Sequence, residues 1–191
     1  VSDDGSKAFV SHAVGGTMSV VALTGDDHAP RAIDVGGVEE RPQRSKLFSM
    51  SMGDRETKRT ACQGFALAKS ADPKGRIFAP QVLVDPGNIE HPSAGYGEGG
   101  AAPPEVGAIA VIDAEGGEPL AASLSIPLES HGMEGERRRD CLLPRSAASD
   151  PTRGAIFVTC LGIDALIAYD ARAAEPHAAE LRRWHVGAGP T

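Results

Sequence analysis

The chain has 191 residues, enough for one domain with a substantial hydrophobic core. Its net charge of −7 at pH 7 argues against a nucleic-acid surface, which needs a basic excess. No stretch approaches the ~20 apolar residues that a membrane-spanning helix requires. Aromatic residues make up only 4% of the chain while glycine and proline are plentiful, so many turns and short strands are expected.

Three segments of the sequence repeat one pattern, a turn with Asp and Gly followed by an apolar strand that ends in a short polar residue. They are Asp4–His12, Asp72–Gln81 and Asp150–Cys160. Aspartate can bond its own backbone, and glycine accepts the positive φ of a tight hairpin. A second and then a third apolar run follow each segment. The second runs are Met18–Leu23, Ala108–Asp113 and Ala165–Asp170, and the third runs are Arg31–Val35, Leu120–Ile126 and Arg182–Val186.

A further strand precedes the second and third copies of the pattern, at Gly64–Lys69 and Leu142–Ala148. The order is then inner strand, second strand, third strand, outer strand, which is the antiparallel meander of a propeller blade. The sequence therefore predicts an all-β fold with negligible helix, a partial β-propeller of about three four-stranded blades. A β-sandwich is the alternative, but it does not predict this recurring order.

The predicted organisation is a single domain over residues 1–191, with blade segments at 1–36, 62–126 and 142–186. The first segment lacks an inner strand, and Gly187–Thr191 resembles a linker, so we expect the chain to begin and end within a blade. Insertions are predicted at 36–61, 85–105 and 129–140. Loops of this kind gather on the faces of a propeller, where ligands and partners bind.

The repeats resemble the YVTN family of β-propellers. Phe9-Val-Ser-His and Phe157-Val-Thr-Cys stand where that family has Tyr-Val-Thr-Asn, and Ser19-Val-Val-Ala and Val111-Ile-Asp stand where it has Ser-Val-Ile-Asp. Phe78-Ala-Pro-Gln departs most from the signature. The resemblance covers most of the chain apart from the insertions.

Four further segments resemble bacterial proteins in which YVTN repeats accompany a c-type cytochrome module like that of the di-haem peroxidases. These are Cys62–Lys69, Asp140–Arg145, Cys160–Ala165 and Arg183–Pro190. The resemblance implies a non-catalytic scaffold or docking element of an exported electron-transfer protein, in the periplasm or at the cell surface. Its partners would be the remaining blades of the propeller, or a partner chain that completes the ring, and a redox protein.

That resemblance implies a haem outside this segment and no cofactor within it. The sequence has no Cys-x-x-Cys-His for covalent haem attachment. Two alternatives remain open: a cell-surface binding module without a redox role, and part of a lactonase-like propeller hydrolase with metal ligands in its central channel. Catalysis by this chain alone is not expected.

Among the candidate site residues, His12 ends its repeat at the position that Gln81 and Cys160 occupy in the others, so these three could form a polar ring. A packed or water-bonded His12 is the simpler interpretation. His131 and Met133 could bind a metal or contact a haem, although one His and one Met fall short of a site. The stretch 95–100 satisfies G-x-G-x-x-G but lacks a flanking strand and helix, so it is interpreted as a loop.

The three cysteines match no zinc-binding spacing. Folding the hairpin at Asp150 brings Cys141 close to the register of Cys160, so we expect these two to form a disulfide. Cys62 precedes the equivalent inner strand of the previous blade, which makes Cys62–Cys141 the rival pairing. Either pairing leaves one thiol.

Overall fold

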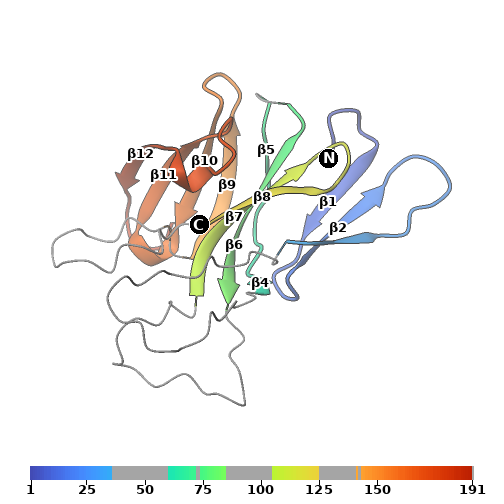
Figure 1. Ribbon diagram of the computed structural model, residues 1–191. Helices are drawn as coiled ribbons and strands as arrows, with labels where there is room; N and C mark the ends of the chain where they lie inside the picture. Colours follow the sequence, from blue (N-terminus) through green and yellow to red (C-terminus); the bar gives the residue numbers. More distant parts are fainter. Residues whose placement is uncertain (36–59, 72–73, 85–104, 125–140, 142, 191) are drawn as a thin grey trace, which may run out of the picture.

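The computed structural model describes residues 1–35, 60–71, 74–84, 105–124, 141 and 143–190, and these form three antiparallel sheets (Figure 1). Blade 1 contains β1 (Lys7–Ser11), β2 (Thr17–Ala22) and β3 (Arg31–Asp34). Blade 2 contains β4 (Thr60–Cys62), β5 (Ala68–Lys69), β6 (Arg76–Val84), β7 (Glu105–Asp113) and β8 (Pro119–Leu124). Blade 3 contains β9 (Pro144–Asp150), β10 (Ala155–Cys160), β11 (Ala165–Asp170) and β12 (Glu180–His185).

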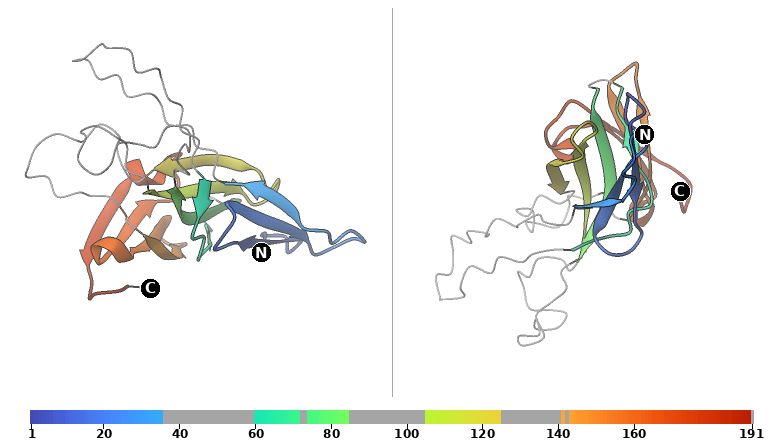
Figure 2. Two further views of the ribbon diagram at one scale, coloured as in Figure 1. Left: turned by 90° about the horizontal axis from the view of Figure 1, so that it is seen from below. Right: turned by 90° about the vertical axis from the view of Figure 1, so that its right-hand side faces the viewer.

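The three sheets stand side by side in chain order, with blade 1 at one end, blade 2 in the middle and blade 3 at the other end (Figures 1 and 2). Blades 1 and 3 are meanders in which neighbouring strands follow one another along the chain; in blade 2 the same holds for β6, β7 and β8, while β4 and β5 both pair with β6. In the described residues of blade 3 and its flanks, the helices are single 3₁₀ turns, η1 (Leu161–Ile163) and η2 (Pro176–Ala178). The prediction of an all-β, partial β-propeller of about three blades is confirmed.

The strand registers align the three repeats residue by residue. Phe9 pairs with Val20, Phe78 with Val111, and Phe157 with Ala168, each at the same position of its second and third strands. One backbone hydrogen bond recurs beyond each of these hairpins: Leu23 N to Ser6 O, Ala114 N to Gly75 O, and Ala171 N to Gly154 O. The repeat seen in the sequence is therefore also a repeat of backbone geometry.

The core lies between the blades, because each blade buries apolar side chains against its neighbour. One cluster joins blades 1 and 2, with Met18, Val20 and Ile33 packed against residues such as Ile77 and Ala110. The other joins blades 2 and 3, where Phe78, Ile109 and Val111 meet Ile156, Val158, Ile167 and Tyr169. Alternate residues of each strand face opposite sides, so blade 2 contributes one face to each cluster.

The inner strand of blade 2 differs from the single strand expected at Gly64–Lys69. It consists of two short pieces, β4 and β5, which both pair with β6. Gln63 between them adopts a positive φ of 57°, a left-handed conformation that interrupts a strand. In blade 3, β9 begins two residues later than the predicted Leu142–Ala148 strand and is continuous.

The predicted insertions lie almost entirely outside the described residues, apart from the ends that enter β4 and β7. In the described part of the chain, no helix has the length and apolarity that crossing a membrane requires.

Candidate functional sites

A small hollow lies at the junction of blades 1 and 2, with room for little more than a water molecule. Its lining includes Ser11 and His12 at the end of β1, Cys62 at the end of β4, and Gln81 in β6. The His12 ring is half-buried, and its Nε2 lies 2.8 Å from the Ser19 hydroxyl on the neighbouring strand. His12 therefore has a hydrogen-bond partner within its own blade.

The repeat-equivalent residues of His12 have other partners. Gln81 is only 2% exposed, and its side-chain amide donates a 2.8 Å hydrogen bond to the Val35 carbonyl of blade 1. Cys160 forms a disulfide. The three side chains are thus engaged separately, and Gln81 contributes to the contact between blades 1 and 2. A buried amide with its hydrogen bond made stabilises one relative placement of the two blades.

The segment that follows β4 crosses close to blade 1. The Gln63 amide N–H donates to the Ala13 carbonyl at 2.9 Å, and a Cβ on Gly64 would lie 2.9 Å from the His12 carbonyl oxygen. The glycine is therefore required by this close approach. The side-chain oxygen of Gln63 is buried, and no donor among the described residues reaches it.

Cys62 is the free cysteine of the described chain and is half-buried beside this crossing. Burial, and secondarily the negative charge of Glu105, raise the pKa of its thiol. A raised pKa keeps the thiol protonated at neutral pH, which makes it a poor nucleophile. Cys62 consequently has the features of a packed residue and not of a reactive one.

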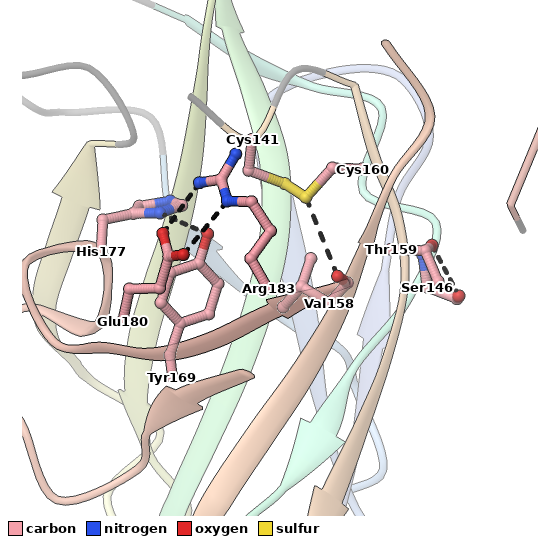
Figure 3. The surroundings of a disulfide bond; sticks show 9 residues. All are labelled: Cys141, Ser146, Val158, Thr159, Cys160, Tyr169, His177, Glu180 and Arg183. Atoms are coloured by element: carbon pink, nitrogen blue, oxygen red, sulfur yellow. Dashed lines mark hydrogen bonds and ion pairs between the residues drawn. A yellow bond between two sulfur atoms is a disulfide. The ribbon is translucent and has the colours of Figure 1, made fainter. Parts of the chain in front are cut away.

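Cys141 and Cys160 form the predicted disulfide, with their Cα atoms 5.1 Å apart (Figure 3). Both residues are buried against blade 2. The bond ties the entry to β9 to the end of β10, next to a hydrogen bond from Leu161 N to the Leu143 carbonyl. The expected pairing is confirmed over the Cys62 alternative, and such bonds are typical of proteins that fold in oxidising, exported compartments.

Tyr169 and His177 form a polar pair at the border of blades 2 and 3 (Figure 3). The Tyr169 hydroxyl lies 3.1 Å from His177 Nδ1, and the rings meet edge to face with centroids 5.0 Å apart. The other ring nitrogen, Nε2, lies in the interior. Burial, together with the positive charge of Arg183, lowers the pKa of His177 to about 3, so the imidazole is neutral at pH 7.

Positively charged side chains link neighbouring blades. In each case a cation of one blade contacts the turn between the third and outer strands of the following blade. Lys7 Nζ donates to the Glu115 carbonyl at 2.5 Å. Arg76 stands at the position equivalent to Lys7, and its Nη1 lies 3.0–3.1 Å from the carbonyls of three consecutive turn residues, 171–173. Both cations thus point from one blade to the same turn of the following blade. Ala155 occupies this position in blade 3.

A second cation reaches the same turn of blade 2. Arg31, in the outer strand of blade 1, pairs with Glu118 at 2.8 Å and donates to the carbonyls of Gly116 and Gly117. Glu118 is well exposed, so the ion pair adds little by itself. The two carbonyl contacts are independent of side-chain charge and fix the guanidinium in place.

The remaining candidate residues, His131 and Met133, lie outside the described residues. Among the residues that the structure does describe, no group of three or more His, Cys, Asp or Glu side chains is placed to hold a metal ion. Sequence patterns gave no signal for the Tyr169–His177 pair or the Lys7 and Arg76 contacts, because their partners lie in a short turn or in another blade.

Comparisons with known proteins give alignments at low identity only. No protein-family model matches the sequence, and no curated protein matches it. Solved structures that align with it include hydrazine synthase of Kuenenia stuttgartiensis, with 13% identity, a TM-score of 0.49 and coverage of the whole chain. The Dos1 propeller aligns with 8% identity over 94% of the chain, with a TM-score of 0.35. Apo AztD of Citrobacter koseri aligns with 14% identity over 95%, with a TM-score of 0.29.

The chain spans 62% of the hydrazine synthase chain, 34% of the Dos1 chain and 47% of the AztD chain. At these identities and scores the likeness carries no argument. The assignment to a propeller architecture rests on the three sheets and their shared register.

Proposed function

We propose that the chain is a non-catalytic β-propeller module that acts as a scaffold and docking element of an exported bacterial electron-transfer protein. The arrangement of blades 1 and 3 carries the scaffold part of this proposal. Blades 1 and 3 each turn one sheet face away from blade 2, and both faces bear partly exposed apolar side chains. Apolar surface of this kind marks sites where other proteins bind.

The disulfide supports the exported part of the proposal. Cys141 and Cys160 are both buried, so the bond forms as part of folding and needs an oxidising environment to persist. The periplasm or the cell surface provides such an environment.

The electron-transfer part rests on the resemblance to YVTN repeats that accompany a c-type cytochrome module. The net charge of −7 adds support, because an acidic surface attracts a basic redox partner and speeds its encounter. In this proposal the haem belongs to another module or protein, and the present chain positions it.

Binding to a basic c-type cytochrome tests the electron-transfer part. Calorimetric titration at about 0.01 M salt should detect weak association that is lost at about 0.3 M, because the shorter Debye length screens charges on the two surfaces. An acidic c-type cytochrome is the matched control and should not bind. Absence of binding at low salt, or equal binding of both cytochromes, would contradict this part.

Production in two compartments tests the exported part. Chain secreted to an oxidising compartment should show one reactive thiol after unfolding without reductant, and chain made in a reducing cytoplasm should show three. Equal thiol counts from the two sources, with three thiols in each, would contradict export.

A further inference from the structure

The outward face of blade 3 repeats, position by position, the face of blade 1 that packs on blade 2. The strand registers make Phe157 equivalent to Phe9 and Leu166 equivalent to Met18. They also make Trp184 equivalent to Ile33, because Trp184 pairs with Leu166 and Ile33 pairs with Met18. In blade 1, blade 2 covers two of these three positions: Met18 and Ile33 are 1% and 3% exposed, and Phe9 is half-buried.

In blade 3 the same positions are half-buried. Phe157 and Trp184 contact each other with ring centroids 6.0 Å apart, and Leu166 lies beside Trp184 in the register. Their neighbours in sequence, such as Ile156 and Ile167, are fully buried toward blade 2, so strand alternation directs Phe157 and Leu166 to the opposite side. These three large side chains of blade 3 are called the large half of the interface below.

The outward face of blade 1 is equivalent to the face of blade 2 that receives blade 1. The receiving residues of blade 2 are Ile77, Ala79, Ala110 and Ile112, which are at most 2% exposed. Their equivalents in blade 1 are Ala8, Val10, Ser19 and Val21. These are small side chains, half-buried or exposed, and Val10 is 45% exposed. These small side chains of blade 1 form the small half of the interface, which complements the large half on blade 3.

The charges on the two faces are also complementary. Arg182 of blade 3 is equivalent to Arg31, and its guanidinium lies 4.9 Å from the centre of the Trp184 ring. Arg31 pairs with Glu118 in the turn between the third and outer strands of blade 2. The corresponding connection of blade 1 carries exposed Asp26 and Asp27. A blade 1 seated on blade 3 would thus bring acidic groups to Arg182.

We propose that the occupant of each face is a second copy of this chain, with blade 3 of one copy packed on blade 1 of the other. This proposal rests on the scaffold part of the proposed function and is independent of the electron-transfer part. Each copy carries both halves of the interface, so two copies make two such contacts. A head-to-tail contact that closes leaves neither half exposed.

The test is the mass of the 191-residue chain in solution, by sedimentation equilibrium. The wild type should be a dimer. Trp184→Glu, which blocks the large half, and Val10→Glu, which blocks the small half, should each raise the dissociation constant at least about tenfold. Leu120→Glu is the matched control: Leu120 is 56% exposed in β8 of the middle blade, and its substitution should leave the dimer intact. Circular dichroism checks that each variant is folded.

Mixing the two blocked variants separates this head-to-tail contact from any other. Trp184→Glu keeps its small half and Val10→Glu keeps its large half, so together they should form a mixed dimer through one intact contact although each alone is monomeric. A wild type that stays monomeric at about 100 μM, a weak-association range, would overturn the proposal, as would growth into longer assemblies. In those cases further blades, of this polypeptide or of another, or an open array, occupy the faces. Loss of cytochrome binding with the dimer retained would contradict only the electron-transfer part.

Discussion

The two interfaces between blades share the same kind of contact at the turns but differ in the side chains packed between the sheets. At the turns, Lys7 and Arg76 reach the carbonyls of the following blade from equivalent positions. Between the sheets, blade 2 meets blade 3 through large side chains such as Phe78 and Tyr169, both fully buried. Blade 1 meets blade 2 through a mixture of apolar residues, the buried Gln81 amide and a small hollow. The contact between a cation and turn carbonyls is therefore common to both interfaces, whereas the side chains packed between the sheets differ.

Exposure of one repeated residue shows the effect of this difference. Phe78 is 0% exposed, whereas its equivalents Phe9 and Phe157 are half-buried. The phenylalanine has the same register in all three blades, so its burial depends on what the next blade places against it. The blade 2–3 interface should therefore contribute more to stability than the blade 1–2 interface.

Truncating the three phenylalanines one at a time should give the largest effect. We expect Phe78→Ala to lower the free energy of unfolding by about 3–5 kcal/mol, because a fully buried aromatic ring is lost and a cavity remains. Phe9→Ala and Phe157→Ala should each cost clearly less, because both of these rings are half-buried. Urea unfolding measures all three. Equal losses at the three sites would contradict the ranking of the interfaces.

Removing the disulfide should lower the free energy of unfolding by about 3 kcal/mol, because the bond joins residues 19 positions apart and restricts the unfolded chain. The double variant Cys141→Ala/Cys160→Ala tests this by urea unfolding without reductant. Cys62→Ala is the control in blade 2 and should cost no more than about 1 kcal/mol, the loss expected at a half-buried site. A larger loss for Cys62→Ala than for the double variant would contradict this prediction.

Acidification should destabilise the protein through His177. Its pKa is lowered to about 3 in the folded protein, so the unfolded chain binds a proton near pH 6.5 and the folded chain does not. Stability from this residue is complete above pH 6.5 and falls as pH decreases, by at most about 1.4 kcal/mol per pH unit. Denaturant midpoints between pH 6.5 and about 5 should show this slope, which His177→Gln removes. Below about pH 5 the carboxyls of Asp3, Asp4 and Asp150, whose pKa values are lowered in the folded protein, also begin to lose stability because the unfolded chain binds protons there.

The smallest effect should come from the cations at the turns. Arg76→Met removes contacts with three carbonyls and should cost about 1–2 kcal/mol, and Lys7→Met removes one contact and should cost less than about 1 kcal/mol. Arg153→Met is the control, since Arg153 is 78% exposed and pairs with Asp150 in its own turn. A cost for Arg153→Met that matches that of Arg76→Met would show that the inter-blade contacts add nothing.

The strand order and the disulfide could be predicted from the sequence because both depend on local signals. Asp and Gly turns recur before Phe9, Phe78 and Phe157, and a hairpin's register follows from the position of its turn. The broken inner strand of blade 2 could not be predicted in this way. The interruption falls at Gln63, which has a positive φ, next to the place where Gly64 passes close to the His12 carbonyl of blade 1, a contact that only the packing of two blades creates.

The same distinction explains the candidate site residues. His12 stood out by its place in the repeat, and the structure gives it a partner in Ser19 within its own blade. His177 shows no spacing to another ligand in the sequence, and its environment comes from Tyr169, a turn away, and from the border with blade 2. The environment of a residue at an interface between blades depends on the neighbouring blade, so its own segment does not encode it.

The choice of carbonyl oxygens as acceptors has a consequence for how such blades diverge. Every residue has a main-chain carbonyl, so the turn that receives Lys7 or Arg76 can change its side chains without losing the contact; Glu115 and Arg172 occupy equivalent positions and have opposite charges. Mutational drift is therefore tolerated on the receiving side, while the donor needs only a long cation. Repeats held together in this way can lose almost all mutual sequence likeness and still assemble in the same order.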